Sequence, residues 1–126
     1  MKSLLAILIG YLVFGVSAVL LFQVAGVDPH KQPGLGFEIG STIYGVFFAL
    51  LAGYAAAHIA GKAEIQHSIG VACILAFLAG ISMLAQPGLD SYWSQEGALI
   101  LMAPSAVLGG WLRKRQARKS DSKQTE

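Results

Sequence analysis

The sequence predicts an all-α membrane protein, a four-helix transmembrane bundle with both termini in the cytoplasm. Three observations predict this fold class: four long apolar stretches, a low share of charged residues, and lysines and arginines that gather on one side. The 126 residues are 55% hydrophobic and 13% charged, whereas a soluble domain carries about 25% charged residues. The chain therefore has too few charges to cover a surface that faces water, and we expect one domain.

Four stretches without Asp, Glu, Lys or Arg fill most of the chain. They are residues 3–27, 39–61, 65–89 and 97–112. A helix needs about 20 apolar residues to cross the hydrocarbon core of a bilayer, and the first three stretches reach this length while the fourth nearly does. We therefore expect a bundle over residues 1–112 and a basic, disordered cytoplasmic tail over residues 113–126. The predicted helices cover about residues 3–26, 38–61, 65–86 and 92–113.

The first apolar stretch is expected to stay in the protein as a span. A signal peptide has an apolar core of about 7–15 residues, and the run from Leu4 to Leu21 is longer. Residues 24–26 are also a poor match to the small-residue pattern of a cleavage site. This helix has no long series of small residues, so we expect it at the periphery of the bundle or at a contact between copies.

Small residues recur at every fourth position of the second and third helices. They are Ser41, Gly45, Ala49, Gly53, Ala57 and Gly61 in the second helix, and Ser68, Ala72, Ala76 and Gly80 in the third. Residues at i and i+4 form one ridge of a helix, and small residues allow helix backbones in a membrane to approach closely. These are the predicted helix-packing sites. Because the connection over residues 61–64 is short, we expect the second and third helices to be the tightest pair.

The fourth helix is expected to cross the membrane although its apolar stretch is the shortest. Tyr92 and Trp93 precede it and Trp111 closes it, and such aromatic rings prefer the headgroup level. Trp93 and Trp111 are 18 positions apart, which is about 27 Å of helix and close to one hydrocarbon thickness. Pro104 lacks an amide hydrogen and crowds the carbonyl of Ile100, so we expect it to kink this helix.

The basic residues orient the bundle, because lysine and arginine accumulate on the cytoplasmic side of membranes. Four spans place both termini on one side, together with the loop between the second and third helices. That side holds Lys2, Lys62 and six basic residues of the tail, whereas the other side holds Lys31 alone. This positive-inside bias predicts cytoplasmic termini. The opposite face carries the acidic residues Asp28, Glu38, Asp90 and Glu96.

The tail begins with a cluster of basic residues directly after the fourth helix. The predicted lipid-headgroup and topology residues are Arg113, Lys114, Arg115, Arg118 and Lys119. Each such charge near anionic lipid contributes about 1 kcal/mol. A topology anchor followed by a disordered polar end is the simpler interpretation, and a specific lipid or protein contact is the alternative. No nucleic-acid partner is expected.

His58 and His67 flank the short connection between the second and third helices. Ionisable residues at membrane depth are candidates for function, but these two lie near the interface, where polar groups cost little. Capping and hydrogen bonding is the preferred interpretation; a proton or metal site and a contact with a partner or headgroup are the alternatives. No catalytic residue, cofactor or metal ion is expected. Cys73, the one cysteine, is expected to pack as a small apolar residue.

One segment resembles a pattern in small four-span bacterial membrane proteins of uncharacterised function. Gly53–Gly61 reads GYAAAHIAG, and His67 begins the next helix. In those proteins a Gly-Gly-Tyr/Phe-x-Ala-Ala-x-Ile-Ala segment ends one helix, and a histidine begins the next after a short basic loop. This chain has Ala52 where the pattern prefers its first glycine. The resemblance covers the hairpin segment Gly53–His67, implies four spans in a bacterial inner (plasma) membrane, and implies no activity.

The spans contain no ionised side chain that could carry charge across a membrane. No Asp, Glu, Lys or Arg lies inside them, which argues against a proton-coupled antiporter and an ion channel with a charged ring. We therefore expect a non-enzymatic packing or accessory component of the lipid bilayer, as a homo-oligomer or beside a larger membrane protein. One alternative is a small oligomeric transporter or pore with Tyr44, Tyr54 and Ser41 along its path. Another is a cytoplasmic-face metal or proton site, or an enzyme, at His58 and His67.

Overall fold

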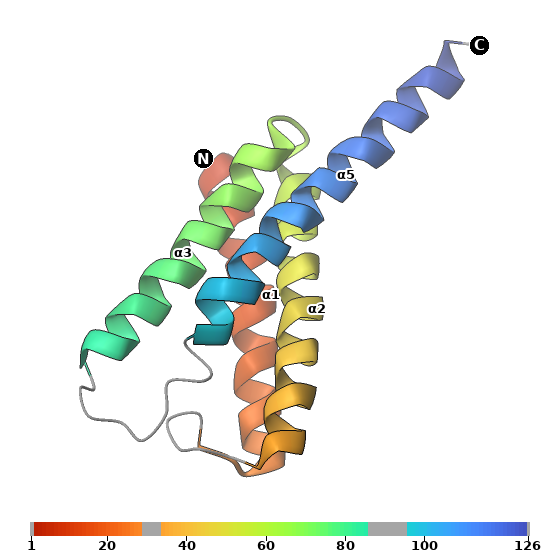
Figure 1. The fold of residues 1–126 in the computed structure, drawn as a ribbon. Coiled ribbons are helices and arrows are strands. Elements are labelled where there is room, and N and C mark those ends of the chain that lie inside the picture. Colours follow the sequence, from red (N-terminus) through yellow and green to blue (C-terminus); the bar gives the residue numbers. More distant parts are fainter. Residues whose placement is uncertain (1, 29–33, 86–95, 126) are drawn as a thin grey trace.

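The computed structural model describes residues 2–28, 34–85 and 96–125 of the chain. The helices in these ranges are α1 (Lys2–Ala25), α2 (Leu35–Ala60), α3 (Glu64–Ala85), the short π-helical turn η1 (Ala98–Met102) and α5 (Ala103–Gln124), which continues from η1 (Figure 1). The described ranges contain no strand, so the all-α prediction is confirmed. By length and composition, α1, α2 and α3 are able to cross a membrane.

The first three helices have bounds close to the predicted ones. α1 and α3 begin and end one residue earlier than expected, whereas α2 begins three residues earlier, at Leu35, and ends at Ala60. Gly61 follows α2 with a left-handed φ of 68° and donates its amide hydrogen to the carbonyl of Ala57, a common way for glycine to end a helix. Gly61 is exposed. It therefore belongs to the turn and not to the predicted packing ridge.

The basic segment after the bundle is helical, not disordered as predicted. α5 runs without a break from Ala103 to Gln124. Residues 111–124 contain no glycine or proline, and arginine, lysine, glutamine and alanine are good helix formers. The helix therefore projects beyond the bundle (Figure 1). The predicted beginning of this helix near residue 92, with Tyr92 and Trp93, lies outside the described residues.

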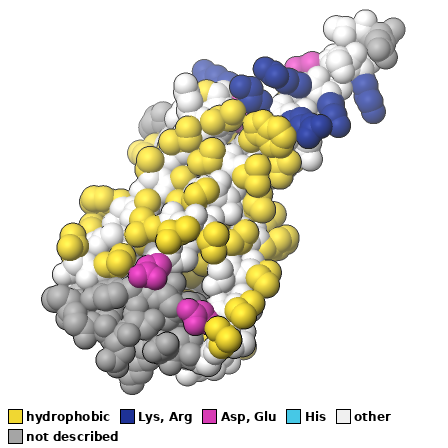
Figure 2. Space-filling view, in the orientation of Figure 1, with side chains coloured by type: hydrophobic (Ala, Val, Ile, Leu, Met, Phe, Trp, Pro, Cys, Tyr) yellow, Lys and Arg dark blue, Asp and Glu magenta, His cyan; other side chains and the backbone are white. Residues whose placement is uncertain are grey.

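Three segments share one end of the bundle: the beginning of α1, the turn between α2 and α3, and the projecting half of α5 (Figure 1). All lysines and arginines among the described residues belong to these segments. Figure 2 shows a dark blue group that continues along α5, next to a broad hydrophobic band, with acidic side chains both beyond this band and on the projecting part of α5. Glu38, in the first turn of α2, belongs to the end opposite the basic group.

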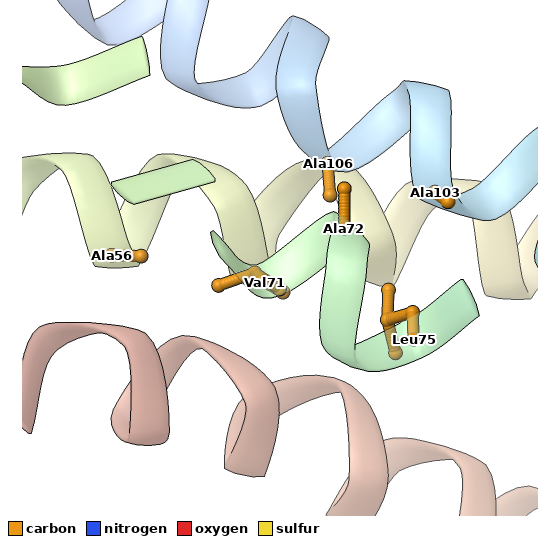
Figure 3. Packing of buried hydrophobic residues seen from close by; sticks show 7 residues of the cluster. Ala56, Val71, Ala72, Leu75, Ala103 and Ala106 are labelled. Carbon is orange, nitrogen blue, oxygen red and sulfur yellow. The ribbon is translucent and has the colours of Figure 1, made fainter. Parts of the chain in front are cut away.

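The core of the bundle consists mainly of alanine. Its buried residues are Ala52, Ala56, Val71, Ala72, Leu75, Ala103 and Ala106 (Figure 3). Among the described residues, Val71 and Ser68 are the largest side chains that are fully buried. Lipid tails solvate large apolar side chains well, so helices in a membrane associate through close packing of small residues. Larger side chains such as Leu5 and Phe77 accordingly lie exposed on the outside.

The most extensive helix contact joins α2 to α5, not α2 to α3 as predicted. The α1–α2 and α3–α5 contacts are also more extensive than the α2–α3 contact. Glycine explains the difference, because a Cβ atom added at Gly53 would overlap the backbone carbonyl of Ala106. One added at Gly109 would overlap the carbonyl of Leu50. The backbones of α2 and α5 therefore touch at two points, and the short connection to α3 does not decide the pairing.

Gly110, the next residue of α5, faces α3 instead of α2. A Cβ atom at this position would overlap the hydroxyl of Ser68 and come within 3.2 Å of the carbonyl oxygen of Glu64. Neighbouring positions on a helix are about 100° apart. The adjacent pair Gly109 and Gly110 thus gives α5 two flat faces, and α5 is wedged between α2 and α3.

The predicted packing residues differ in burial. Buried members are Ser41, Gly45, Ala49, Gly53 and Ala57 of α2, and Ser68 and Ala72 of α3. Ala76 packs against the core but is half-buried. Gly80 is half-buried and has open space where a Cβ atom would lie. On α3, the ridge therefore makes its close contacts in the first half of the helix.

α1 is the least buried of the three long apolar helices, yet Gly10 brings its backbone against two other helices; the predicted contact between copies stays a prediction. A Cβ atom at Gly10 would lie 2.7 Å from the carbonyl oxygen of Ala52, 2.9 Å from the Cβ of Ala56 and 3.0 Å from a methyl group of Val71. Among the described residues α1 packs on α2 and α3 but not on α5. The short pair of small residues Ala6 and Gly10 is thus enough, and a sustained series is not needed.

Pro104 lies in the first turn of α5, directly after the π-helical turn η1. A π-helix closes its hydrogen bonds over five residues instead of four, so the wider turn relieves the contact that a proline makes with the carbonyl four residues earlier. The hydroxyl of Ser105 donates to the carbonyl of Leu101 at 2.6 Å. The predicted conflict at Pro104 is therefore resolved by η1.

Candidate functional site

A pocket with basic walls lies where α5 leaves the bundle, at the end that carries the dark blue group of Figure 2. It has a volume of about 340 Å³ and is lined by Ile65, Trp111, Lys114, Arg115 and Arg118. Ile65 belongs to the first turn of α3, and the other four residues belong to α5. These four follow one another at spacings of three, one and three residues, which places them on one helix face. This basic pocket therefore depends on the helical state of the segment.

Trp111 positions one of the cations. The guanidinium carbon of Arg115 lies 5.4 Å from the centroid of the Trp111 ring, which is a cation–π distance. The planar guanidinium stacks well on an aromatic face while its N–H groups remain free to donate. The pocket thus combines apolar walls, from Ile65 and Trp111, with the positive charges of Lys114, Arg115 and Arg118.

Of the five predicted headgroup residues, three line this basic pocket and two do not. Arg113 is half-buried elsewhere on α5, and its Nε is buried without a hydrogen-bond partner in the described residues. Lys119 is exposed and lies outside the pocket. Lys114, Arg115 and Arg118 form no ion pair with any acidic residue in the described ranges. The helical spacing from residue 111 to residue 118 was the sequence signal for this shared face.

A polar contact fixes the projecting part of α5 to α2. The hydroxyl of Tyr54 donates to Oε1 of Gln116 at 2.6 Å. The ring of Tyr54 is also parallel to that of His58, one turn further along α2, with centroids 6.3 Å apart. Tyr54, one of the residues that the transporter hypothesis names, thus ties α2 to the projecting part of α5.

The two histidines occupy different environments. His58 is exposed, whereas His67 is buried. Nδ1 of His67 lies 2.9 Å from the carbonyl oxygen of Ala63, and since a carbonyl only accepts, Nδ1 carries the proton in this hydrogen bond. Ala63 has a left-handed φ of 50°, so His67 ties down a strained turn residue. Within the described residues no group of three His, Cys, Asp or Glu side chains is placed to hold a metal ion.

The hydroxyl groups near the other end of the bundle donate to backbone carbonyls. A cavity of about 120 Å³ lies there between α1, α2 and η1, and its lining includes Ser17, Ser41, Thr42 and Tyr44. Ser17 donates to Phe14, Ser41 and Thr42 donate to Glu38, and Tyr44 donates to Ser17, at 2.6 to 3.1 Å. These donors are already used. The cavity therefore presents mainly apolar walls, and Ser41 and Tyr44 lie ten or more positions before Tyr54 on α2.

No protein-family model, no curated protein and no solved structure matches this chain. The resemblance of Gly53–His67 to four-span bacterial membrane proteins therefore stays a prediction.

Proposed function

We propose that the protein is a non-enzymatic component of a bacterial inner membrane, with four spans and cytoplasmic termini. It acts as a packing or accessory subunit, either as a homo-oligomer or beside a larger membrane protein. The observation that carries this proposal is the filled interior: α5 contacts α2 through Gly53 and Gly109, and α3 through Gly110, with backbone against neighbouring helix. Such close contacts hold the helices together, as a packing or accessory role requires.

The outer surface supports the same proposal. Large apolar side chains are exposed on every helix, among them Leu5 on α1, Phe47 on α2, Phe77 on α3 and Leu108 on α5. The buried polar side chains of the described residues are three serines and His67, so no Asp, Glu, Lys or Arg is buried there. Extended apolar surfaces of this kind mark contacts with lipid or with another protein. We therefore expect the functional contacts of the protein on its outer surface.

A fourth span is supported by the position of η1 and the apolar half of α5. A Cβ atom at Gly45 of α2 would overlap Met102 of η1, and one at Gly109 of α5 would overlap the carbonyl of Leu50 of α2. η1 and the first half of α5 thus lie alongside α2, and α2 is long and apolar enough to span a membrane. From Ala98 to Leu112 the helix is about 21 Å long at 1.5 Å per residue.

Cysteine labelling tests this topology. In a Cys73→Ser parent, single cysteines at Lys2 and Ser122 should react with an impermeant reagent only from the cytoplasmic side. A cysteine at Gln32 should react only from the other side. The reason is that basic residues are retained in the cytoplasm. Reaction of the Gln32 variant from the cytoplasm would contradict the proposed orientation.

Oligomeric mass and solute flux together test the accessory role. Purified protein in a mild detergent should give one defined mass, as a homo-oligomer, or be recovered with a larger membrane protein when isolated from native membranes. Liposomes that contain the protein should leak small ions and neutral solutes no faster than empty liposomes, with a pore-forming peptide as the positive control. Flux that increases with the amount of protein would favour the transporter or pore instead.

A further inference from the structure

The basic pocket has the composition of a site for an anion that also carries an apolar part. Three cations, Lys114, Arg115 and Arg118, line it together with Trp111 and Ile65. We propose that this pocket binds the phosphate group of an anionic phospholipid at the cytoplasmic surface of the membrane. This inference goes beyond the proposed accessory role, which needs no lipid site, although it uses the proposed topology to place the pocket at the headgroup level.

The three cations of the pocket outnumber the acidic residue nearest to them on α5, Asp121, and form no ion pair within the described part of the protein. Lys114 and Arg118 are one helical turn apart, and like charges at this spacing repel each other. Glu64 is the nearest acidic residue in sequence to Ile65, yet it forms no ion pair with the three cations. An anion held between the cations would replace this repulsion by attraction. The pocket therefore favours a ligand that brings negative charge.

Phosphate suits these side chains better than other common anions do. A guanidinium group donates two parallel hydrogen bonds to two phosphate oxygens, and the guanidinium carbon of Arg115 lies over the Trp111 ring, a contact that uses the face of the group and not its N–H edge. Lys114 adds a compact charge on the same helix face. A tetrahedral group with several oxygens can accept from all three cations at once.

The position of the pocket favours a lipid over a soluble phosphate compound. Leu108 and Leu112, within one turn of Trp111, are exposed apolar side chains, and Lys114 and Arg115 follow directly. The outer surface of α5 thus changes from apolar to basic across the pocket itself. Tryptophan prefers the level of the headgroups, and basic pockets at the cytoplasmic ends of transmembrane helices bind anionic headgroups. Acyl chains would contact the leucines while the phosphate occupies the pocket.

Lipid binding to the full-length protein, with two charge-matched double variants, tests this proposal. Lys114→Gln with Arg118→Gln removes two charges from the pocket, and Lys119→Gln with Lys123→Gln removes two charges from the exposed projection. Affinity for phosphatidylglycerol is measured in nanodiscs of phosphatidylcholine, whose headgroup has no net charge. We expect the pocket variant to bind about 10- to 30-fold more weakly, and the control variant to lose less than about threefold.

Several results would overturn the lipid site. Equal losses in the two variants would show a diffuse attraction to the surface instead of a pocket. If inorganic phosphate or glycerol phosphate displaces phosphatidylglycerol at the concentrations at which the lipid itself binds, the pocket is a site for a soluble anion. Circular dichroism should give the same helical content for both variants, which verifies that α5 is folded. If α5 has unfolded in the pocket variant, single variants at Lys114 and Arg115 repeat the test. Failure here leaves the flux and mass results, and so the accessory role, untouched.

Discussion

Replacement of Gly53 by leucine should destabilise the protein in detergent by about 1–3 kcal/mol or more, the cost of overpacking a core. Even the Cβ atom of an alanine at this position would overlap the backbone carbonyl of Ala106, and its carbonyl carbon would lie only 2.6 Å away. A backbone atom cannot turn aside as a flexible side chain can. Either substitution must therefore push α5 away from α2, and unfolding followed by circular dichroism should show the loss.

Gly40→Ala is the matched control for this prediction. Gly40 lies in the same helix, and nothing lies within 4 Å of the place where its Cβ atom would be. Alanine in the interior of a helix is favoured over glycine by about 0.5–1 kcal/mol, so this variant should be as stable as the parent or more stable. If Gly53→Ala and Gly40→Ala unfold alike, α2 and α5 do not touch at Gly53.

Gly110→Ala should also be strongly destabilising, and Ser68→Gly should restore much of the loss. The added Cβ atom would overlap the hydroxyl of Ser68 and lie 2.5 Å from its Cβ. Ser68→Gly removes both atoms, and the next nearest atom is then the carbonyl oxygen of Glu64 at 3.2 Å. In a double-mutant cycle the two changes should therefore couple by about 1–3 kcal/mol.

Ser68→Gly alone has its own cost, which the cycle subtracts. It loses the hydrogen bond from Ser68 Oγ to the carbonyl of Ile65, at 2.8 Å, and places glycine inside a helix, which together cost about 1–2 kcal/mol. The expected sign is nevertheless clear: alanine at position 110 should be harmful beside serine and nearly harmless beside glycine. Additive losses would mean that α3 and α5 do not meet at this pair.

The sequence predicted which residues of α2 are small and share a ridge, but not which helix that ridge would meet. A period of four identifies a face of a helix and says nothing about its neighbour. The connection at Gly61 suggested α3, whereas the adjacent glycines Gly109 and Gly110 were the signal for α5. Two neighbouring glycines give a helix two flat faces at once, which one unbroken series cannot do. On α1, Ala6 and Gly10 are both buried, and this short pair was enough without a longer series.

The basic pocket does not follow from the sequence prediction, because that prediction makes the segment after Leu112 a disordered tail. Charge counting identified Lys114, Arg115 and Arg118 as headgroup residues, but a disordered chain has no faces. Once residues 111–118 are helical, Trp111 joins the three cations on one side, and Ile65 closes the space from α3. The part of Ile65 could not be predicted at all, since it depends on how α3 and α5 cross. The π-turn before Pro104 was likewise hidden, although the conflict that it relieves was visible in the sequence.

The unbroken helix from Ala103 to Gln124 forms a rigid arm that projects from the bundle. From Trp111 to Gln124 the helix is about 20 Å long at 1.5 Å per residue, and it has no hinge of glycine or proline. A disordered tail would absorb a pull at its end. A rigid arm instead passes a sideways load to its base, where Gln116 is tied to Tyr54. Beyond that tie, α5 meets α2 at Gly109 and α3 at Gly110 through close contacts, so we expect a sideways force on the free end of α5 to reach the packing between α2 and α3.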